Sequence, residues 1–137
     1  MSIYLDTNVF FFAGFGDEKD PRTQKAKELL MRIGEGKEMA YTSLITIDEL
    51  IWAIIRQKKD RKTAIEQGLR MHALPIHFIP LITSISLRAL HLMQRHHINP
   101  RDALHAASCI EVKATNLVTE DDDFDTVKDI KRIRLVN

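Results

Sequence analysis

Acidic side chains are the residues of this chain best suited to chemistry, and they are densest in LVTEDDDFD, residues 117–125. Five acids within six positions of that segment repel one another unless water or a cation offsets their charge. Asp6, Glu49 and Asp102 lie far from it in the sequence. Several carboxylates meeting in one pocket would bind a hard divalent cation such as Mg²⁺ or Mn²⁺, because these ions prefer oxygen ligands. The elements that carry the acids decide whether they meet.

Short apolar runs alternate with helical patterns along the chain. Asp20-Pro21 and Asn99-Pro100 each provide a capping side chain followed by a proline at the first helical position. The alternation predicts an α/β fold, a three-layer α/β/α sandwich with a central parallel sheet of four or five strands, in one domain of residues 1–137. The predicted strands are SIYL, MAYT, IHFIP, NLVT and IRLV, at residues 2–5, 39–42, 76–80, 116–119 and 133–136. The predicted helices cover residues 21–34, 43–58, 61–71, 84–96 and 100–112.

The carboxyl ends of parallel strands meet at one edge of a sheet, where α/β proteins bind their ligands. Asp6 directly follows the first predicted strand, and Asp121 follows NLVT by two residues, so both should lie at that edge. Asp102 falls in the first turn of a predicted helix. For Asp102 alone, we favour the simpler interpretation that its carboxylate interacts with the helix dipole.

The predicted helix SLITIDELIWAIIRQ is apolar in nearly every direction, which is typical of a buried helix. Asp48 and Glu49 would then be carboxylates in a core-like element, which is costly unless each has a partner, a proton or a metal. Periodicity does not choose between them. A capping box from Thr46 to Glu49, or an ion pair of Glu49 with Arg56, would also account for Glu49.

Composition restricts the class of protein. Hydrophobic residues at 45% and charged residues at 28% are typical of a soluble globular domain, and we expect a cytoplasmic protein without a signal peptide or membrane span. The single cysteine, Cys109, excludes an internal disulfide and a cysteine-rich zinc site, and we expect it to be a buried apolar residue. The net charge of +1 argues against bulk attraction to nucleic acid. One basic run could follow an RNA backbone or form a solvated face, and we rate the two equally: Arg56, Lys58, Lys59, Arg61 and Lys62.

Two other groups of side chains have alternative interpretations. His105 lies one turn after Asp102, and we expect it to be a packing or hydrogen-bonding residue near the site rather than a catalytic one. His96-His97 lacks a third ligand at useful spacing for zinc, so a solvated helix end is favoured. The phenylalanines near the N-terminus could stack on bases, pack in the core, or form a patch covered by another chain, namely Phe10, Phe11, Phe12 and Phe15.

Four segments in order, YLDTNVF, SLITIDEL, NPRDALHAA and LVTEDDDFD, resemble the motifs of PIN-domain ribonucleases of the compact VapC type, which are toxins of toxin–antitoxin pairs. Each motif is short, but together they cover nearly the whole chain. The resemblance implies a Mg²⁺- or Mn²⁺-dependent endoribonuclease, and it selects Glu49 over Asp48. The implied catalytic acids are Asp6, Glu49, Asp102 and Asp121, the implied metal ligands are Asp6, Asp102, Asp121 and Asp123, and the implied polar pocket residues are Thr7, Asn8 and Thr119.

The resemblance also implies a mechanism and partners. A metal-activated water would attack the phosphorus in line and leave 5′-phosphate and 3′-hydroxyl ends. The implied partners are RNA, a small antitoxin that inserts a basic or aromatic side chain, and a second copy of the chain. The alternatives are an RNA-processing or quality-control PIN nuclease without an antitoxin, and a non-catalytic acidic-pocket module that binds RNA or protein. Within LVTEDDDFD, we expect Phe124 to pack inward and the remaining acids to be solvated, namely Glu120, Asp122 and Asp125.

Overall fold

The structure is a computed structural model that describes residues 2–137. Its centre is a five-stranded sheet with the order β3-β2-β1-β4-β5, in which every neighbouring pair is parallel. The strands are β1 (Ser2–Leu5), β2 (Met39–Ser43), β3 (Ile76–Ile79), β4 (Asn116–Val118) and β5 (Lys131–Ile133). The helices are α1 (Thr7–Phe15), α2 (Pro21–Gly34), α3 (Ile45–Lys58), α4 (Arg61–Ala73), α5 (Thr83–Arg95) and α6 (Pro100–Glu111), and a 3₁₀ turn, η1, covers Asp122–Thr126.

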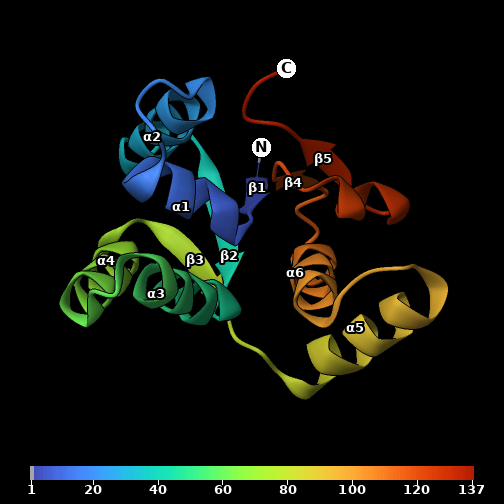
Figure 1. The fold of residues 1–137 in the computed structure, drawn as a ribbon. Helices are drawn as coiled ribbons and strands as arrows, with labels where there is room; N and C mark the ends of the chain where they lie inside the picture. The colour runs from blue at the N-terminus through green and yellow to red at the C-terminus, as the bar shows by residue number, and fades with distance from the viewer. Residues whose placement is uncertain (1) are drawn as a thin grey trace.

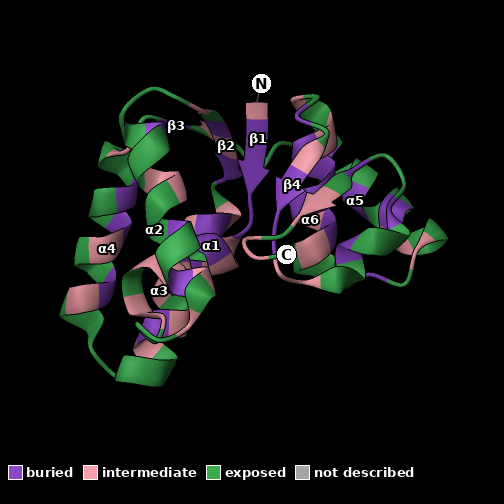
Figure 2. Ribbon diagram, turned by 90° about the horizontal axis from the view of Figure 1, so that it is seen from above, coloured by how far each residue is buried: buried purple, intermediate pink, exposed green. Residues whose placement is uncertain are grey.

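Helices cover both faces of the sheet, which confirms the predicted three-layer α/β sandwich (Figure 1). Helices α1 to α4 pack on one face and α5 and α6 on the other. Because side chains alternate along a strand, Ile3 and Leu5 of β1 enter the core beneath α1 to α4, whereas Tyr4 enters the core beneath α5 and α6. Figure 2 shows the buried residues concentrated along β1 and β4 and on the inner sides of the helices. Among residues 2–137, no helix is both long and apolar enough to cross a membrane.

Two elements differ from the sequence prediction. Helix α1 was not predicted, because residues 9–15, VFFFAGF, have no polar side chain that would give the run a helical period. It begins directly after Asp6, whose side chain caps it. The last strand lies at Lys131–Ile133 and not at the more apolar residues 133–136. Lys131 pairs with Asn116 at the start of β4, and a short strand with charged residues is typical of a sheet edge.

The burial of α3 also differs from the prediction, and α5 is likewise apolar on an exposed side. Helix α3 is not buried all round, because Trp52 is 52% exposed while Leu50 and Ile54 face the core. Helix α5 likewise directs Leu87 and Leu90 outward, with 54% and 57% of their surface exposed. The core positions of α5 are Ile85, Ala89 and Leu92. Apolar side chains therefore occur on both the inner and the outer sides of these two helices.

Candidate active site

Asp6 is held at the carboxyl end of β1 by hydrogen bonds on both carboxylate oxygens. Its backbone N–H donates to the carbonyl of Val118 on β4, which continues the sheet by one residue. Oδ1 accepts from the backbone N–H of Thr7 at 2.8 Å, and Oδ2 accepts from the Thr119 hydroxyl at 2.7 Å and the Asn8 amide at 3.2 Å. The Asp6 side chain is buried, and these hydrogen bonds fix its carboxylate in one orientation.

The Thr119 hydroxyl links the ends of β1 and β4. While it donates to Asp6, it accepts hydrogen bonds from the backbone N–H of Asp121 and from the Asn8 amide, each at 3.0 Å. Thr119 is completely buried, so these bonds are not shared with bulk water. One side chain thus sets the separation of the two loops that carry Asp6 and Asp121.

Glu49 reaches the site from the first half of α3 and meets a histidine of α6. The Nε2–H of His105 donates to Glu49 Oε1 at 2.5 Å, and the Thr7 hydroxyl donates to the same oxygen at 2.8 Å. His105 Nδ1 shares a hydrogen bond of 2.7 Å with the hydroxyl of Tyr4 on β1. His105 is fully buried and its Nε2 lies 3.5 Å from Asp6 Oδ1. An ion pair with Arg56 was one alternative that the sequence left open for Glu49, and its hydrogen-bonded partner is His105.

The electrostatics of this pair favour a charged state. Burial raises the pKa of Glu49, but the hydrogen bond and charge of His105, together with the Thr7 hydroxyl and the charge of Arg101, hold it below its usual range. Burial lowers the pKa of His105, yet its bond to Glu49 and the charges of Asp6 and Glu49 raise it above its usual range. Glu49 therefore remains an ionised acceptor near neutral pH.

The remaining acids form a more open group. One carboxylate oxygen each from Asp102, Asp121 and Asp123 lies within 4.8 Å of the others. Burial, followed by the charges of Asp121 and Asp6, raises the pKa of Asp102 to about 7. Within residues 2–137, none of the three forms an ion pair with a basic side chain. The first turn of α6 places Asp102 where the helix dipole would favour its charge, but burial and neighbouring acids outweigh that effect.

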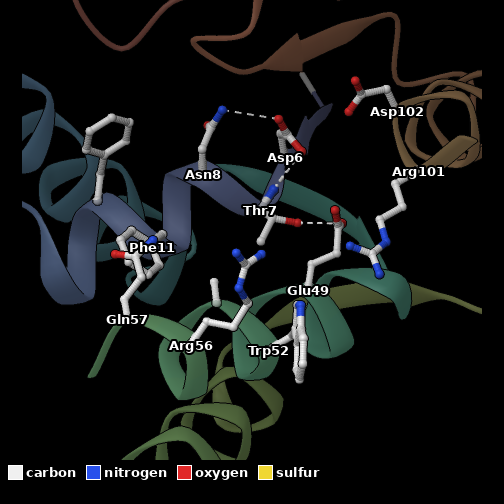
Figure 3. A pocket seen from close by; sticks show the side chains of 12 residues that line it. Asp6, Thr7, Asn8, Phe11, Glu49, Trp52, Arg56, Gln57, Arg101 and Asp102 are labelled. Atoms are coloured by element: carbon white, nitrogen blue, oxygen red, sulfur yellow. Dashed lines mark hydrogen bonds between the residues drawn. The ribbon is translucent and has the colours of Figure 1, made fainter. Parts of the chain in front are cut away.

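Asp6, Glu49 and Asp102 line a cavity of about 560 Å³ between α1, α3 and α6, whereas Asp121 and Asp123 are not among its lining residues (Figure 3). Asp6, Glu49 and Asp102 point into it from three different elements. Aromatic and basic side chains form the rest of its wall. Its lining residues are Asp6, Thr7, Asn8, Phe11, Phe12, Glu49, Trp52, Ala53, Arg56, Gln57, Arg101 and Asp102.

Three lining residues were missed or misassigned from the sequence. Trp52 was expected in the core, Arg101 was not considered although it precedes Asp102 in NPRDALHAA, and Gln57 carried no signal. Arg56 is the one member of the basic run that lines this cavity. The others are exposed at the end of α3 and the start of α4, namely Lys58, Lys59, Arg61 and Lys62.

The other acids of LVTEDDDFD have separate surroundings. Glu120 is not solvated as expected, because its carboxylate accepts from the backbone N–H of Leu135 at 2.6 Å and lies 3.6 Å from Arg134. Asp125 is exposed but forms two hydrogen bonds with Arg132. Asp122 is exposed, and Phe124 packs inward with 1% of its surface exposed, both as predicted.

Solved structures with a similar fold come from several bacteria. VapBC2 from Rickettsia felis, solved bound to a DNA fragment from its promoter, is 18% identical with a TM-score of 0.74 over 98% of both chains. VapC20 from Mycobacterium tuberculosis, described as a toxin that cleaves the sarcin-ricin loop, is 18% identical with a TM-score of 0.75 over 92% of this chain and 95% of that one. A toxin-antitoxin complex from Klebsiella pneumoniae is 22% identical with a TM-score of 0.67 over 94% and 95%.

No curated protein sequence matches the chain at a significant level. The family model described as the PIN domain, in contrast, matches residues 3–130, which include all four segments singled out in the sequence. The match also spans each of the acids that surround the cavity. The chain belongs to the PIN domain family.

Proposed function

We propose that this protein is a divalent-metal-dependent endoribonuclease and the toxin of a toxin–antitoxin pair. The observation that carries the proposal is the meeting of acids from separate elements: Asp6, Glu49 and Asp102 line one cavity. Oxygens of Asp102, Asp121 and Asp123 also lie within 4.8 Å of one another. An all-oxygen set of this kind suits a hard cation, Mg²⁺ or Mn²⁺, better than zinc. Asp6 lies beside the group, close enough for its charge to raise the pKa of Asp102.

Asp102, Asp121 and Asp123 would hold the cation, with Asp6 as a further ligand. Bound there, a divalent cation would supply positive charge to a phosphate under attack and make a water molecule more acidic. The geometry of this chain assigns separate tasks to the neighbouring groups. Thr119 and Asn8 orient the Asp6 carboxylate, because both donate to its Oδ2.

Glu49 is the residue best placed to accept a proton from the attacking water. Its hydrogen bonds within residues 2–137 all reach Oε1, which leaves Oε2 for the proton. His105 and Thr7 keep the carboxylate ionised and correctly oriented. His105 is a positioning residue, because it is fully buried and acts through Glu49. The products would carry 5′-phosphate and 3′-hydroxyl ends.

The direct test is RNA cleavage by the purified protein. We expect cleavage with Mg²⁺ or Mn²⁺, loss of activity with a chelator, and loss of activity in Asp102→Asn. Asp48→Asn is the matched control, since Asp48 is an exposed acid on α3 that does not line the cavity. A wild-type protein that leaves RNA intact with either metal would refute the enzyme and favour a non-catalytic module.

The toxin role rests on similar folds whose descriptions name VapBC or toxin-antitoxin complexes. Expression of the wild-type chain should arrest bacterial growth, and Asp102→Asn should not. A small neighbouring protein that binds the chain and restores growth would be the antitoxin. Wild-type cleavage of RNA without growth arrest would instead indicate an RNA-processing nuclease.

A second copy of the chain is a further expected partner, and α5 is the proposed contact surface because Leu87 and Leu90 are more than half exposed there. Light scattering after gel filtration should give a dimer for the wild type and a monomer for Leu90→Asp. Leu69→Asp on α4, at a position that is 66% exposed, is the control and should leave the mass unchanged.

A further inference from the structure

The aromatic and basic end of the cavity has no role in the hydrolysis described above. Asp6 and Asp102 lie at one end and Trp52 and Arg56 at the other, with Glu49 and Arg101 between them (Figure 3). Trp52 follows Glu49 by three residues and Arg56 follows Trp52 by four, so that one side of α3 carries all three. Arg101 faces them from α6 and lies close enough to Glu49 to lower its pKa.

The indole of Trp52 is unusually open for so large an aromatic side chain. It is 52% exposed although Leu50 and Ile54 on the same helix are buried. Among the described residues, no ring and no cation stacks on it. An exposed aromatic ring that lines a binding cavity is typical of a residue that stacks on a flat ligand.

The two arginines also lack a close ion-pair partner among residues 2–137. Within the described range 2–137, neither Arg56 nor Arg101 forms a hydrogen bond or a close ion pair. Both are exposed and line the same cavity as Trp52. Unpaired guanidinium groups beside an acidic cluster provide attraction for phosphates that the acids alone would repel.

We propose that this end of the cavity binds an unpaired nucleotide next to the cleaved phosphodiester, with its base stacked on Trp52 and its phosphates contacting Arg56 and Arg101. The proposal rests on the ribonuclease function. The cavity of about 560 Å³ suits one nucleotide and not a helix. Both faces of a base inside a duplex are already stacked on neighbours, so the substrate must be single-stranded or present an extruded base.

A peptide fits the same surface less well. A basic peptide would be attracted by the acids but repelled by the two arginines, and an acidic peptide would meet the opposite conflict. A nucleotide combines a flat apolar base with an anionic phosphate, which matches the order of groups along the cavity. Binding of an aromatic or basic peptide at Trp52 is therefore the competing outcome of the experiment.

Trp52 provides its own reporter, because it is the only tryptophan of the chain. We would titrate Asp102→Asn with Mg²⁺ and a fluorescein-labelled eight-nucleotide RNA, so that binding is measured without cleavage. Saturable quenching of tryptophan fluorescence is expected with the single strand and at least tenfold weaker binding with its duplex. If anisotropy reports binding while tryptophan fluorescence is unchanged, RNA does not cover Trp52 and the proposal is overturned. Quenching by a basic or aromatic peptide but not by RNA would overturn it in favour of a protein ligand.

Variants separate stacking from charge. Trp52→Ala should weaken single-strand binding by roughly 5- to 100-fold, whereas Trp52→Phe should retain most of it. Arg56→Gln and Arg101→Gln should each reduce the slope of log binding constant against log salt concentration by about one, because one fewer phosphate contact releases counterions. The matched controls are Leu69→Ala, an exposed apolar residue on α4, and Lys27→Gln, an exposed basic residue on α2 outside the cavity.

The two proposals fail in distinguishable ways. If the wild type cleaves RNA and Trp52→Ala cleaves and binds it equally well, the nucleotide site is wrong and the nuclease stands. If the wild type neither cleaves nor binds RNA, both are wrong. Circular dichroism of each variant checks folding, and the quenching experiment needs no substitution at Trp52.

Discussion

Asp6 and Glu49 are each held by several hydrogen bonds from neighbouring groups, whereas Asp102, Asp121 and Asp123 form no close ion pair with a basic side chain among residues 2–137. We call these two sets the bonded pair and the open trio. The bonded pair is organised by the protein itself. The carboxylates of the open trio lie close together and repel one another, and this repulsion contributes to the raised pKa of Asp102. A bound cation would relieve the repulsion. In such a site the protein itself orients the bonded pair, whereas a bound cation would hold the open trio in place.

Substitution of one acid from each set should have the largest effect and should separate them most clearly. Glu49→Gln and Asp102→Asn should both lower cleavage by roughly three orders of magnitude. Their effects on metal-free stability should have opposite signs at pH 8. Glu49→Gln weakens the bond to His105 and should cost about 1–3 kcal/mol, whereas Asp102→Asn relieves repulsion and should add about 1–2 kcal/mol.

Denaturant unfolding with a chelator measures this difference. Asp48→Asn should change neither activity nor stability appreciably, because Asp48 is exposed on α3 away from the cavity. Equal destabilisation by Glu49→Gln and Asp102→Asn would show that the two sets are not distinct.

Thr119 joins the two sets, and its hydroxyl should be the next most sensitive group. Thr119→Val keeps the shape but removes the donor to Asp6 and the acceptor for the Asp121 N–H. Cleavage should fall by about 10- to 100-fold, and stability by about 1–3 kcal/mol. Thr119→Ser should recover most of both. A valine variant with normal kinetics would mean that the two loops position themselves without this link.

The open trio should make metal binding dependent on pH. With the pKa of Asp102 at about 7, a proton competes with the cation, so the Mn²⁺ affinity should fall about tenfold per pH unit below that value. In metal-free protein the folded state binds this proton more tightly than the unfolded state does. Stability should therefore fall as pH rises from about 4 to about 7 and then level off.

Calorimetric titration with Mn²⁺ and denaturant unfolding across this pH range check both trends. In Asp102→Asn, both the Mn²⁺ affinity and the stability of the metal-free protein should depend much less on pH. An affinity that is constant from about pH 5 to 8 would contradict the assignment of Asp102 as a ligand.

Asp123 is the most exposed member of the open trio, and its replacement should have the smallest effect. Asp123→Asn should weaken Mn²⁺ binding by about three- to tenfold, because one of several charged ligands becomes neutral. Asp122→Asn, at the neighbouring exposed position outside the trio, is the matched control. An equal loss of Mn²⁺ affinity in both variants would indicate that the cation is attracted by the overall negative charge and is not coordinated by Asp123.

Most of the sheet could be predicted from sequence because short apolar runs between helical patterns have few other interpretations. Four of the five strands lie within about a residue of the expected positions. Helix α1 could not be predicted because residues 9–15 have no polar side chain, and its start depends on Asp6 as a cap, which only the fold reveals. The last strand depends on pairing with β4, a long-range contact that overrides local hydrophobicity.

The site was only partly predictable. Strand ends indicated Asp6 and Asp121, but the choice of Glu49 and Asp102 required the resemblance to a family. The expected hydrogen-bonding role of His105 is confirmed, but its partner could not be derived from spacing, because its bond to Glu49 joins residues 56 positions apart. Trp52 was misplaced for a related reason. Helix α3 has enough apolar residues for a complete core face and still leaves an indole outside.

The pairing of β1 with β4 places residues from the beginning and the end of the chain in one hydrogen-bonded unit. Asp6 and Thr119 are 113 positions apart and are bonded at 2.7 Å. During synthesis, Asp6 therefore emerges long before its partner strand, and the cavity cannot assemble until β4 has left the ribosome. The hydrogen bonds that orient the Asp6 carboxylate are therefore completed only after residue 119 has been translated.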